Sequence, residues 1–120
     1  PHDQDSKRLP FAQAEFGIVG LETLLPIALE LFHNWHLPLL GVLGAMTARP
    51  AALLGLPLGR LGIGGPADLV LFDLNRPRQI DVEHFRSKSK NSPFDQRPVQ
   101  GCTLRTVVDG RTVYSLDGEP

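Results

Sequence analysis

The spacing of apolar residues changes near residue 60, and this change constrains the fold of the 120-residue chain more than any other feature. Residues 21–35 carry apolar side chains at the 3.6-residue period of a helix, at Leu24, Leu25, Ala28, Leu31 and Phe32. Residues 67–73 instead contain a continuous apolar run, which is typical of a buried strand. We therefore expect an α/β chain with helices first and strands second, and with a boundary between residues 57 and 65.

Two further helices are predicted before the boundary. Residues 38–48 are apolar on all sides and short enough for one helix. Pro50 suits the first turn of a third, shorter helix, and Gly55 is a plausible residue for its C-terminal cap. Amphipathic helices need a surface to cover, and no strand comes before them in this sequence. We therefore expect further polypeptide before Pro1.

A hairpin is the clearest signal after the boundary. Residues 104–108 and 112–115 flank Asp109-Gly110, a dipeptide that favours the positive φ angles of a type I′ turn. Residues 79–85 alternate between apolar and polar side chains, which predicts another short strand.

Composition excludes some classes of partner. The net charge of −1 indicates neither nucleic acid nor an anionic membrane, and the densest basic run, residues 86–90, is interpreted as a solvated loop. No apolar stretch reaches the roughly 18 residues that span a bilayer. Cys102 is the only cysteine and lies in an apolar alternating run. A buried structural thiol and a reducing, cytosolic compartment are therefore expected.

Several residue clusters have a structural and a functional interpretation. Residues 59–65 are glycine-rich, but they precede a strand, whereas a dinucleotide-binding loop follows one; a tight connector is the favoured interpretation. His33 and His36 have a spacing that can present two metal ligands, or they can simply suit a helix C-terminus. Asp3 and Asp5 can bind a cation or remain solvated, and the solvated interpretation is favoured in so polar a stretch.

The loop before the first helix is the best candidate for contact with a ligand. His2 and Phe16-Gly17 lie in loops, where functional groups concentrate. Gly17 and Gly20 allow backbone amides to approach a bound molecule closely.

Three segments of the chain resemble the dihydroorotase family of cyclic amidohydrolases, in its C-terminal portion. Phe16–Thr23 reads FGIVGLET, and Pro1-His2 lies upstream of it like the end of the family's D-H-A-P-H motif. The second segment is GGPADLVLFD and the third is SKSKNSPFDQRPVQGCTLRTVVDGRTVY. Glu15 departs from the family, which more often has proline there.

The resemblance implies a particular fold for each half of the chain. Residues 1–58 would be the end of a (β/α)8 TIM-type amidohydrolase barrel, with a substrate loop and the terminal helices. Residues 59–120 would be the C-terminal strands of a small β-sandwich domain. The substrate loop would lie at the face of the barrel where the strands end, the face on which such enzymes build their active sites.

The resemblance also implies a reaction: the reversible, metal-dependent cyclisation of N-carbamoyl-L-aspartate to L-dihydroorotate in pyrimidine biosynthesis. His2 would bind the substrate carboxylate, and the backbone of Phe16 and Gly17 would contact the ring amide. One or two zinc ions are implied, with their ligands and the catalytic Asp upstream of this chain. No catalytic or metal-binding residue is then expected among the 120, and the isolated chain is expected to be inactive.

The sequence leaves alternatives open. The family includes homologues that have lost their metal ligands and only scaffold a carbamoyltransferase, and dihydropyrimidinase or allantoinase are related cyclic amidohydrolases. A free-standing α+β binding module is a further alternative. The expected partners are the remainder of the polypeptide, dihydroorotate or N-carbamoyl-aspartate, and either a second copy of the chain or aspartate carbamoyltransferase, in the cytoplasm.

Overall fold

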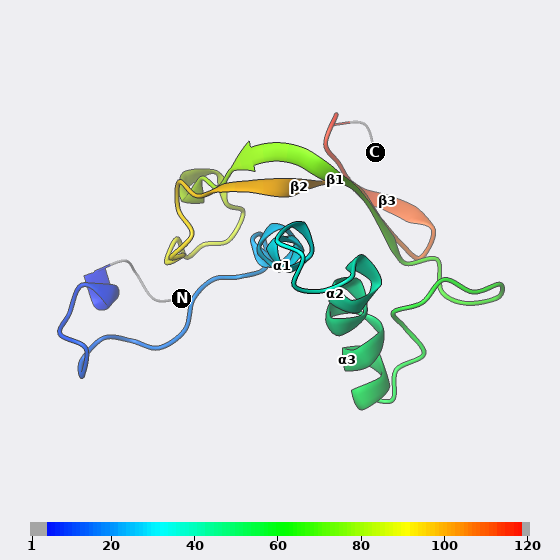
Figure 1. Cartoon of the computed structure of the whole chain (residues 1–120), viewed down its shortest axis with the longest axis horizontal. Coiled ribbons are helices and arrows are strands. Elements are labelled where there is room, and N and C mark those ends of the chain that lie inside the picture. The colour runs from blue at the N-terminus through cyan, green and yellow to red at the C-terminus, as the bar shows by residue number, and fades with distance from the viewer. Residues whose placement is uncertain (1–4, 119–120) are drawn as a thin grey trace.

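A three-stranded antiparallel sheet with helices below it forms the body of the protein (Figure 1). The structure is a computed structural model that describes residues 5–118. Its helices are α1 (Leu24–His33), α2 (Leu39–Met46) and α3 (Ala48–Leu53), and its strands are β1 (Leu69–Gln79), β2 (Pro98–Val108) and β3 (Arg111–Ser115). Two short 3-10 helices, Asp5–Lys7 and Val82–His84, lie outside this framework. The strand order is β1-β2-β3.

The three predicted helices are confirmed, and the end of α3 shows why the prediction worked there. Gly55 has φ +67°, a left-handed conformation that glycine adopts at little cost. Its N–H donates to the carbonyl of Ala52 at 3.1 Å, and the N–H of Leu56 donates to the carbonyl of Ala51 at 2.8 Å. These two bonds form a Schellman motif, which satisfies carbonyls that the helix end would otherwise leave unpaired.

The hairpin between β2 and β3 is also confirmed. Asp109 and Gly110 have φ angles of +50° and +72°, as a type I′ turn requires at both central positions. Val108 pairs with Arg111 across the turn. The Asp68 carboxylate accepts a hydrogen bond from the N–H of Asp109 at 2.8 Å, which ties the turn to the start of β1.

The strand predicted over residues 79–85 is wrong. β1 ends at Gln79, and residues 82–84 form a 3-10 helix. Asp81 Oδ1 accepts a hydrogen bond from the Glu83 N–H at 3.0 Å, and Asp95 Oδ1 accepts one from the Val82 N–H at 3.1 Å. Carboxylates therefore satisfy the backbone donors that a neighbouring strand would have used.

The strand predicted over residues 67–73 is present, but its expected burial is wrong for this chain. Leu69, Val70 and Leu71 are exposed. Within residues 5–118, β1 is an edge strand that pairs only with β2. The helix α1 packs against β2 and not against this end of β1. The apolar run at the start of β1 therefore has no covering layer within residues 5–118.

The core lies where α1 meets β2 and the segment that follows β1. Its buried members are Ile80, Val82, Phe85 and Val99, with Val19, Ile27 and Phe94 packed against them. Leu29 is fully buried under Gly101, whose φ of +106° and missing side chain allow the close approach of helix and sheet. Cys102 is buried as expected and is a free thiol.

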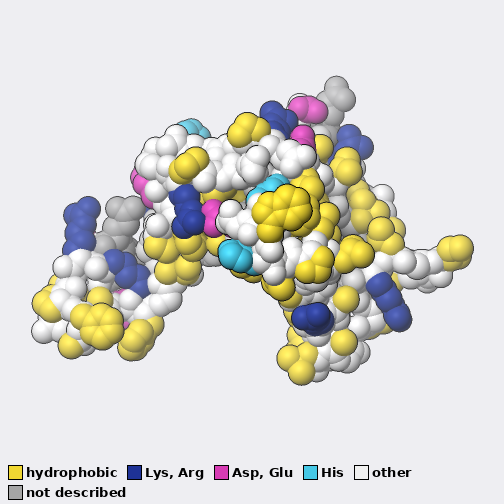
Figure 2. Space-filling view, viewed as in Figure 1, with side chains coloured by type: hydrophobic (Ala, Val, Ile, Leu, Met, Phe, Trp, Pro, Cys, Tyr) yellow, Lys and Arg dark blue, Asp and Glu magenta, His cyan; other side chains and the backbone are white. Residues whose placement is uncertain are grey.

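The buried face of α1 differs from the predicted one. Pro26 and Leu29 are the buried residues of the helix, whereas Leu24 and Leu31 are exposed. Figure 2 shows further apolar side chains on the surface of the lower, helical part of the molecule. Among residues 5–118, no helix is long and apolar enough to cross a membrane. The division of the chain at residue 58 into two domains stays a prediction.

Candidate functional site

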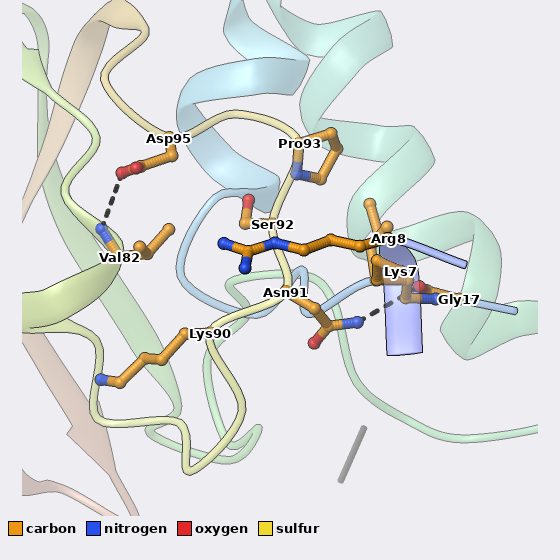
Figure 3. Close-up of a pocket in the computed structure, with 10 residues that line it drawn as sticks. Lys7, Arg8, Gly17, Val82, Lys90, Asn91, Ser92, Pro93 and Asp95 are labelled. Carbon is orange, nitrogen blue, oxygen red and sulfur yellow. Dashed lines mark hydrogen bonds between the residues drawn. The ribbon is translucent and has the colours of Figure 1, made fainter. Parts of the chain in front are cut away.

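The segment predicted to contact a ligand, residues 16–20, is called the ligand loop below. It lies directly against the loop that precedes β2. The Val19 N–H donates to the Asn91 carbonyl at 3.3 Å, and Asn91 Nδ2 donates to the Gly17 carbonyl at 3.3 Å (Figure 3). Asn91 thus contacts the backbone on both sides of Ile18. The two segments are 74 residues apart in the sequence, so this contact depends on the tertiary fold.

Glu22 fixes the other end of the same contact. Its two carboxylate oxygens accept hydrogen bonds from the backbone N–H groups of Arg86, at 3.1 Å, and Ser87, at 3.0 Å. Hydrogen bonds to an ionised acceptor are stronger than those between neutral groups. The loop of residues 86–93 is therefore attached at two places to the segment that leads into α1.

Two shallow cavities adjoin this contact, and both are lined by Gly17, Ile18 and Asn91. The first has a volume of about 420 Å³, and its other lining residues are Lys7, Arg8, Val82, Lys90, Ser92, Pro93 and Asp95 (Figure 3). The second has a volume of about 450 Å³, and its other lining residues are Phe16, Val19, Ser87, Lys88 and Ser89. The backbone of the predicted ligand loop is thus accessible from solvent on this surface.

Phe16 and Gly17 are both exposed at the tip of the loop. Gly17 has φ +84°, which disfavours any residue with a side chain, and no atom lies within 4 Å of the place where a Cβ would be. Within residues 5–118, glycine is therefore required here by backbone conformation rather than by crowding. The third predicted site residue, His2, lies outside the described residues.

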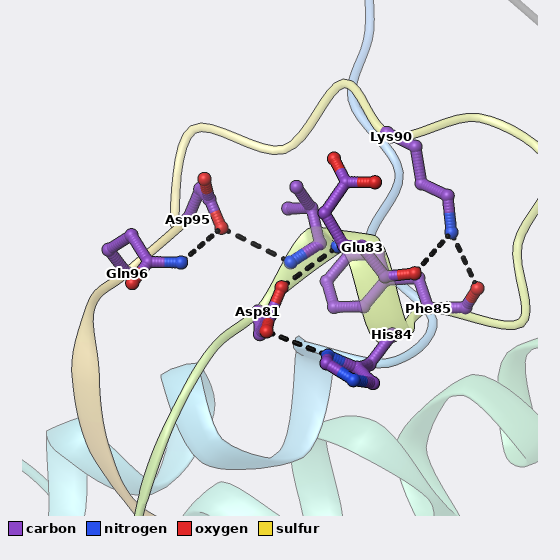
Figure 4. Close-up of polar contacts among 8 residues, drawn as sticks. Asp81, Glu83, His84, Phe85, Lys90, Asp95 and Gln96 are labelled. Carbon is purple, nitrogen blue, oxygen red and sulfur yellow. Dashed lines mark hydrogen bonds and ion pairs between the residues drawn. The ribbon is translucent and has the colours of Figure 1, made fainter.

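The interpretation of residues 86–90 as a solvated loop is wrong in part. Arg86 and Lys88 are exposed, but Ser89 is buried and Lys90 is half-buried. The Lys90 ammonium donates to the carbonyls of Glu83, at 3.2 Å, and Phe85, at 2.7 Å (Figure 4). The cation closes a turn of backbone instead of projecting into water.

A hydrogen bond between two side chains joins the two ends of the 3-10 helix beside the first cavity. Asp81 Oδ2 lies 2.7 Å from His84 Nδ1, and Asp81 Oδ1 accepts the Glu83 N–H (Figure 4). The hydrogen bond with His84, followed by that with the Glu83 N–H, lowers the pKa of the Asp81 carboxyl below its usual 3.8. Both side chains are well exposed to solvent, at 85% for His84 and 40% for Asp81, so the pair is screened.

A family model described as "Amidohydrolase family" matches residues 34–114. The chain is 53% identical over 115 residues to the dihydroorotase of Wolbachia sp. subsp. Drosophila simulans, strain wRi, covering 96% of this chain and 26% of that protein. It is also 53% identical over 117 residues to the dihydroorotase of Anaplasma phagocytophilum, strain HZ, covering 98% of this chain and 26% of that protein. The chain thus spans about a quarter of the length of the curated relatives it matches.

This chain belongs to the amidohydrolase family. Among solved structures, the L-hydantoinase (dihydropyrimidinase) of Arthrobacter aurescens is similar over 87% of this chain and 24% of that one, with a TM-score of 0.81 and 38% identity. The D-hydantoinase of Thermus sp. has a TM-score of 0.84 over 96% of this chain and 26% of that one, and its 21% identity speaks for the fold alone. The resemblance inferred from the motifs is confirmed at the level of the family.

The amidohydrolase family implies a metal, and the described residues do not provide a site for it. Among residues 5–118, no three histidine, cysteine, aspartate or glutamate side chains are grouped so that they could hold an ion. His33 Nε2 lies 3.1 Å from the Leu74 carbonyl, so this ring links α1 to β1. His36 is exposed beyond the end of α1. We therefore assign no chemical step in this chain to a bound metal.

Sequence reasoning missed Asn91, Ser89 and Glu22, which connect the ligand loop to the rest of the chain. Their signal was weak because Ser89 and Asn91 are common polar residues within a polar stretch, and Glu22 is a single carboxylate in the segment that leads into α1. The third segment of the family resemblance includes Ser89 and Asn91, but the pattern alone does not say what they contact. Their burial and the distance of their partners along the chain emerge only in the fold.

Proposed function

We propose that this amidohydrolase chain is the C-terminal portion of a dihydroorotase. The complete enzyme would interconvert N-carbamoyl-L-aspartate and L-dihydroorotate plus water in pyrimidine biosynthesis. The observation that carries the proposal is the 53% identity to the Wolbachia dihydroorotase over 96% of this chain. The exposed backbone of Phe16 and Gly17, adjoining two cavities, is compatible with the substrate contact proposed for it.

Within this proposal, the residues of this chain bind and orient the substrate. The backbone of Phe16 and Gly17 would form hydrogen bonds with the ring amide. His2, which lies outside the described residues, would donate a charge-assisted hydrogen bond to the substrate carboxylate. Zinc, one or two ions, would polarise the ring carbonyl and activate water. Its ligands and the catalytic Asp would lie in the part of the polypeptide that precedes Pro1.

The finer points of the fold and cellular context are also proposals. Residues 1–58 would complete a (β/α)8 barrel, and residues 59–120 would belong to a small β-sandwich domain. The exposed apolar side chains of α2 and α3 support this arrangement, because a barrel would cover them. We propose a cytoplasmic enzyme that associates with a second copy of itself or with aspartate carbamoyltransferase.

A second candidate function is hydrolysis of another cyclic amide. The 38% identity to an L-hydantoinase (dihydropyrimidinase) over 87% of this chain favours this candidate over unrelated chemistries. A dihydroorotase-like scaffold without activity is the third candidate, and it depends on metal ligands outside this chain.

The experiment that tests these candidates uses the full polypeptide, purified with its metal. Turnover of dihydroorotate, dihydrouracil, hydantoin and allantoin is measured side by side, together with zinc by elemental analysis. We expect turnover of dihydroorotate above the other three, with bound zinc. Preference for another ring would favour the second candidate, and absence of both zinc and turnover would favour the scaffold.

The role of His2 has its own test in the same protein. His2→Ala should weaken the binding of dihydroorotate, because loss of a hydrogen bond to a charged group costs about 1.5–3 kcal/mol. The zinc content should be unchanged, since His2 is not proposed as a ligand. Loss of zinc with retained substrate affinity would show that the role is misassigned.

A further inference from the structure

The contact between Asn91 and Gly17 joins the strand-rich half of the chain to the loop proposed to bind substrate. Asn91 is 9% exposed and Ser89 is 8% exposed, so both are buried beside a loop that is itself open to solvent. A buried polar side chain is costly unless it is hydrogen-bonded. Both ends of the Asn91 amide are used, which makes the side chain a fixed support and not an adaptable surface group.

The direction of the Asn91 amide follows from its two partners. The Gly17 carbonyl can only accept, so the group facing it at 3.3 Å must be the NH2. The oxygen then faces the Ser89 hydroxyl, which donates to it at 2.5 Å. Ser89 therefore holds the Asn91 side chain in the orientation in which it donates to Gly17. Figure 3 shows this bond from Asn91 to Gly17.

The same hydrogen bond determines where the next amide points. A trans peptide is planar, so the Gly17 carbonyl and the Ile18 N–H point in opposite directions. With the carbonyl held by Asn91, the Ile18 N–H is turned away from Asn91, and within residues 5–118 it has no hydrogen-bond partner. It is a backbone donor held in a fixed direction on the exposed loop.

Glycine makes such a support necessary. Gly17, at φ +84°, has no side chain to restrict its backbone, so the peptide on its C-terminal side can rotate unless it is held. A ligand that binds to a loop already held in position avoids the cost of ordering that loop.

We propose that Asn91 is a positioning residue, oriented by Ser89, that holds the Gly17–Ile18 peptide so that its N–H donates to the cyclic amide substrate. The inference rests on the proposed function, because it assumes that this loop contacts the substrate ring. It adds Ile18 as a backbone donor, and it assigns to the strand-rich half of the chain a role in substrate affinity.

The test uses the full, zinc-loaded polypeptide with the variants Asn91→Ala, Asn91→Asp and Ser89→Ala. Asn91→Ala removes one hydrogen bond, and KM for dihydroorotate should rise about three- to tenfold while kcat changes less than twofold. Asn91→Asp keeps an acceptor for Ser89 but sets a carboxylate against the Gly17 carbonyl, so its KM should rise more. Ser89→Ala leaves the donor in place but unsupported, and its KM should rise least.

The matched control is Asn75→Asp. Asn75 is an exposed asparagine of β1; its backbone N–H donates to Asp73 at 2.9 Å, and its side chain makes no hydrogen bond within residues 5–118. The substitution makes the same change of charge away from the ligand loop, and KM and kcat should equal those of the wild type. Melting temperature and zinc content are measured for every variant.

A merely structural role for Asn91 would give a different result. It would lower the melting temperature, the zinc content and kcat together while KM stayed within twofold of the wild type. That result with an active wild type would overturn the inference and leave the proposed function intact. If the Asn91 variants do not fold, an unchanged KM in Ser89→Ala overturns it equally. A wild type without turnover of any cyclic amide would refute the proposed function and the role of Asn91 with it.

Discussion

The core around Ile80 and the helices α2 and α3 differ in how completely this chain covers them. Ile80 is fully buried, and its neighbours come from β2, from the segment after β1 and from the residues around the start of α1. In α2 and α3, by contrast, Leu40 is 82% exposed and Leu53 is 87% exposed. Both regions are rich in apolar residues, so composition does not separate them.

This difference shows which contacts the chain satisfies by itself. The Ile80 core joins segments from both halves of the sequence and is closed by hydrogen bonds such as those from Asn91 to the ligand loop. The exposed apolar side chains of α2 and α3, such as Leu40 and Leu53, are candidates for an interaction site. Under the proposed function, the remainder of the polypeptide covers them.

The largest expected effect on stability comes from a substitution in the core around Ile80. Ile80→Ala should lower the free energy of unfolding of the full polypeptide by about 2–5 kcal/mol, because it leaves a cavity among side chains that cannot all collapse into it. Denaturant unfolding followed by circular dichroism measures the change. Ile63→Ala, on the exposed connector before β1, is the matched control and should change stability by less than about 0.5 kcal/mol. Similar losses in both variants would mean that the closed core is misplaced.

The approach of α1 to the sheet gives the next prediction. In Gly101→Ala, the new Cβ would lie 2.5 Å from Leu29 Cδ1, at a backbone φ of +106° that side chains rarely adopt. Overpacking and backbone strain should together lower the free energy of unfolding by about 1–3 kcal/mol.

Gly44→Ala is the matched control for Gly101→Ala. Gly44 lies inside α2, and no atom comes within 4 Å of its Cβ position. Alanine is the better helix former, so this variant should gain up to about 1 kcal/mol. Relative to the wild type, the melting temperature of the full polypeptide should therefore fall in Gly101→Ala and rise in Gly44→Ala. Equal destabilisation would contradict this prediction, because it would mean that Gly44 lies against a tightly packed neighbour in the full polypeptide.

The features predicted correctly from the sequence have local causes. Asp109 and Gly110 determine the hairpin turn by their own φ preferences, and Gly55 ends α3 by its own. The fold family followed from three motifs whose order along the chain is itself a strong constraint. Such features can be predicted from the sequence because the residues that determine the local structure lie within the motif itself.

The features that were missed depend on partners far along the chain. Residues 79–85 alternate like a strand, but the Asp95 carboxylate takes the Val82 N–H and so favours a 3-10 helix instead. The predicted apolar face of α1 exists, but the sheet packs against the neighbouring face around Leu29. In the sequence, Asn91 is one of several polar loop residues. Its role depends on Gly17, which is 74 residues away along the chain.

The smallest expected effect on stability concerns the exposed Asp81–His84 pair, which lies next to the core around Ile80. The pKa of Asp81 is lowered below 3.8 in the folded protein, chiefly by the hydrogen bond with His84. A lowered folded pKa means that the ionised carboxylate stabilises the fold fully above about pH 3.8, and that this contribution is lost as the pH falls through the folded value. Asp81→Asn should therefore melt slightly below the wild type at pH 7, and the gap should close as the solution is acidified toward and below pH 3.8.

Calorimetric melting of the full polypeptide across this pH range measures the gap. Asp117→Asn is the control, because Asp117 is exposed and has no ion pair or side-chain hydrogen bond within residues 5–118. It makes the same change of charge, and its melting temperature should follow that of the wild type at every pH. His84→Ala should reproduce part of the Asp81→Asn gap at pH 7, since it removes the first cause of the lowered pKa. A gap that stays constant down to the lowest pH would mean that Asp81 acts through its shape and hydrogen-bonding capacity, with no contribution from its charge.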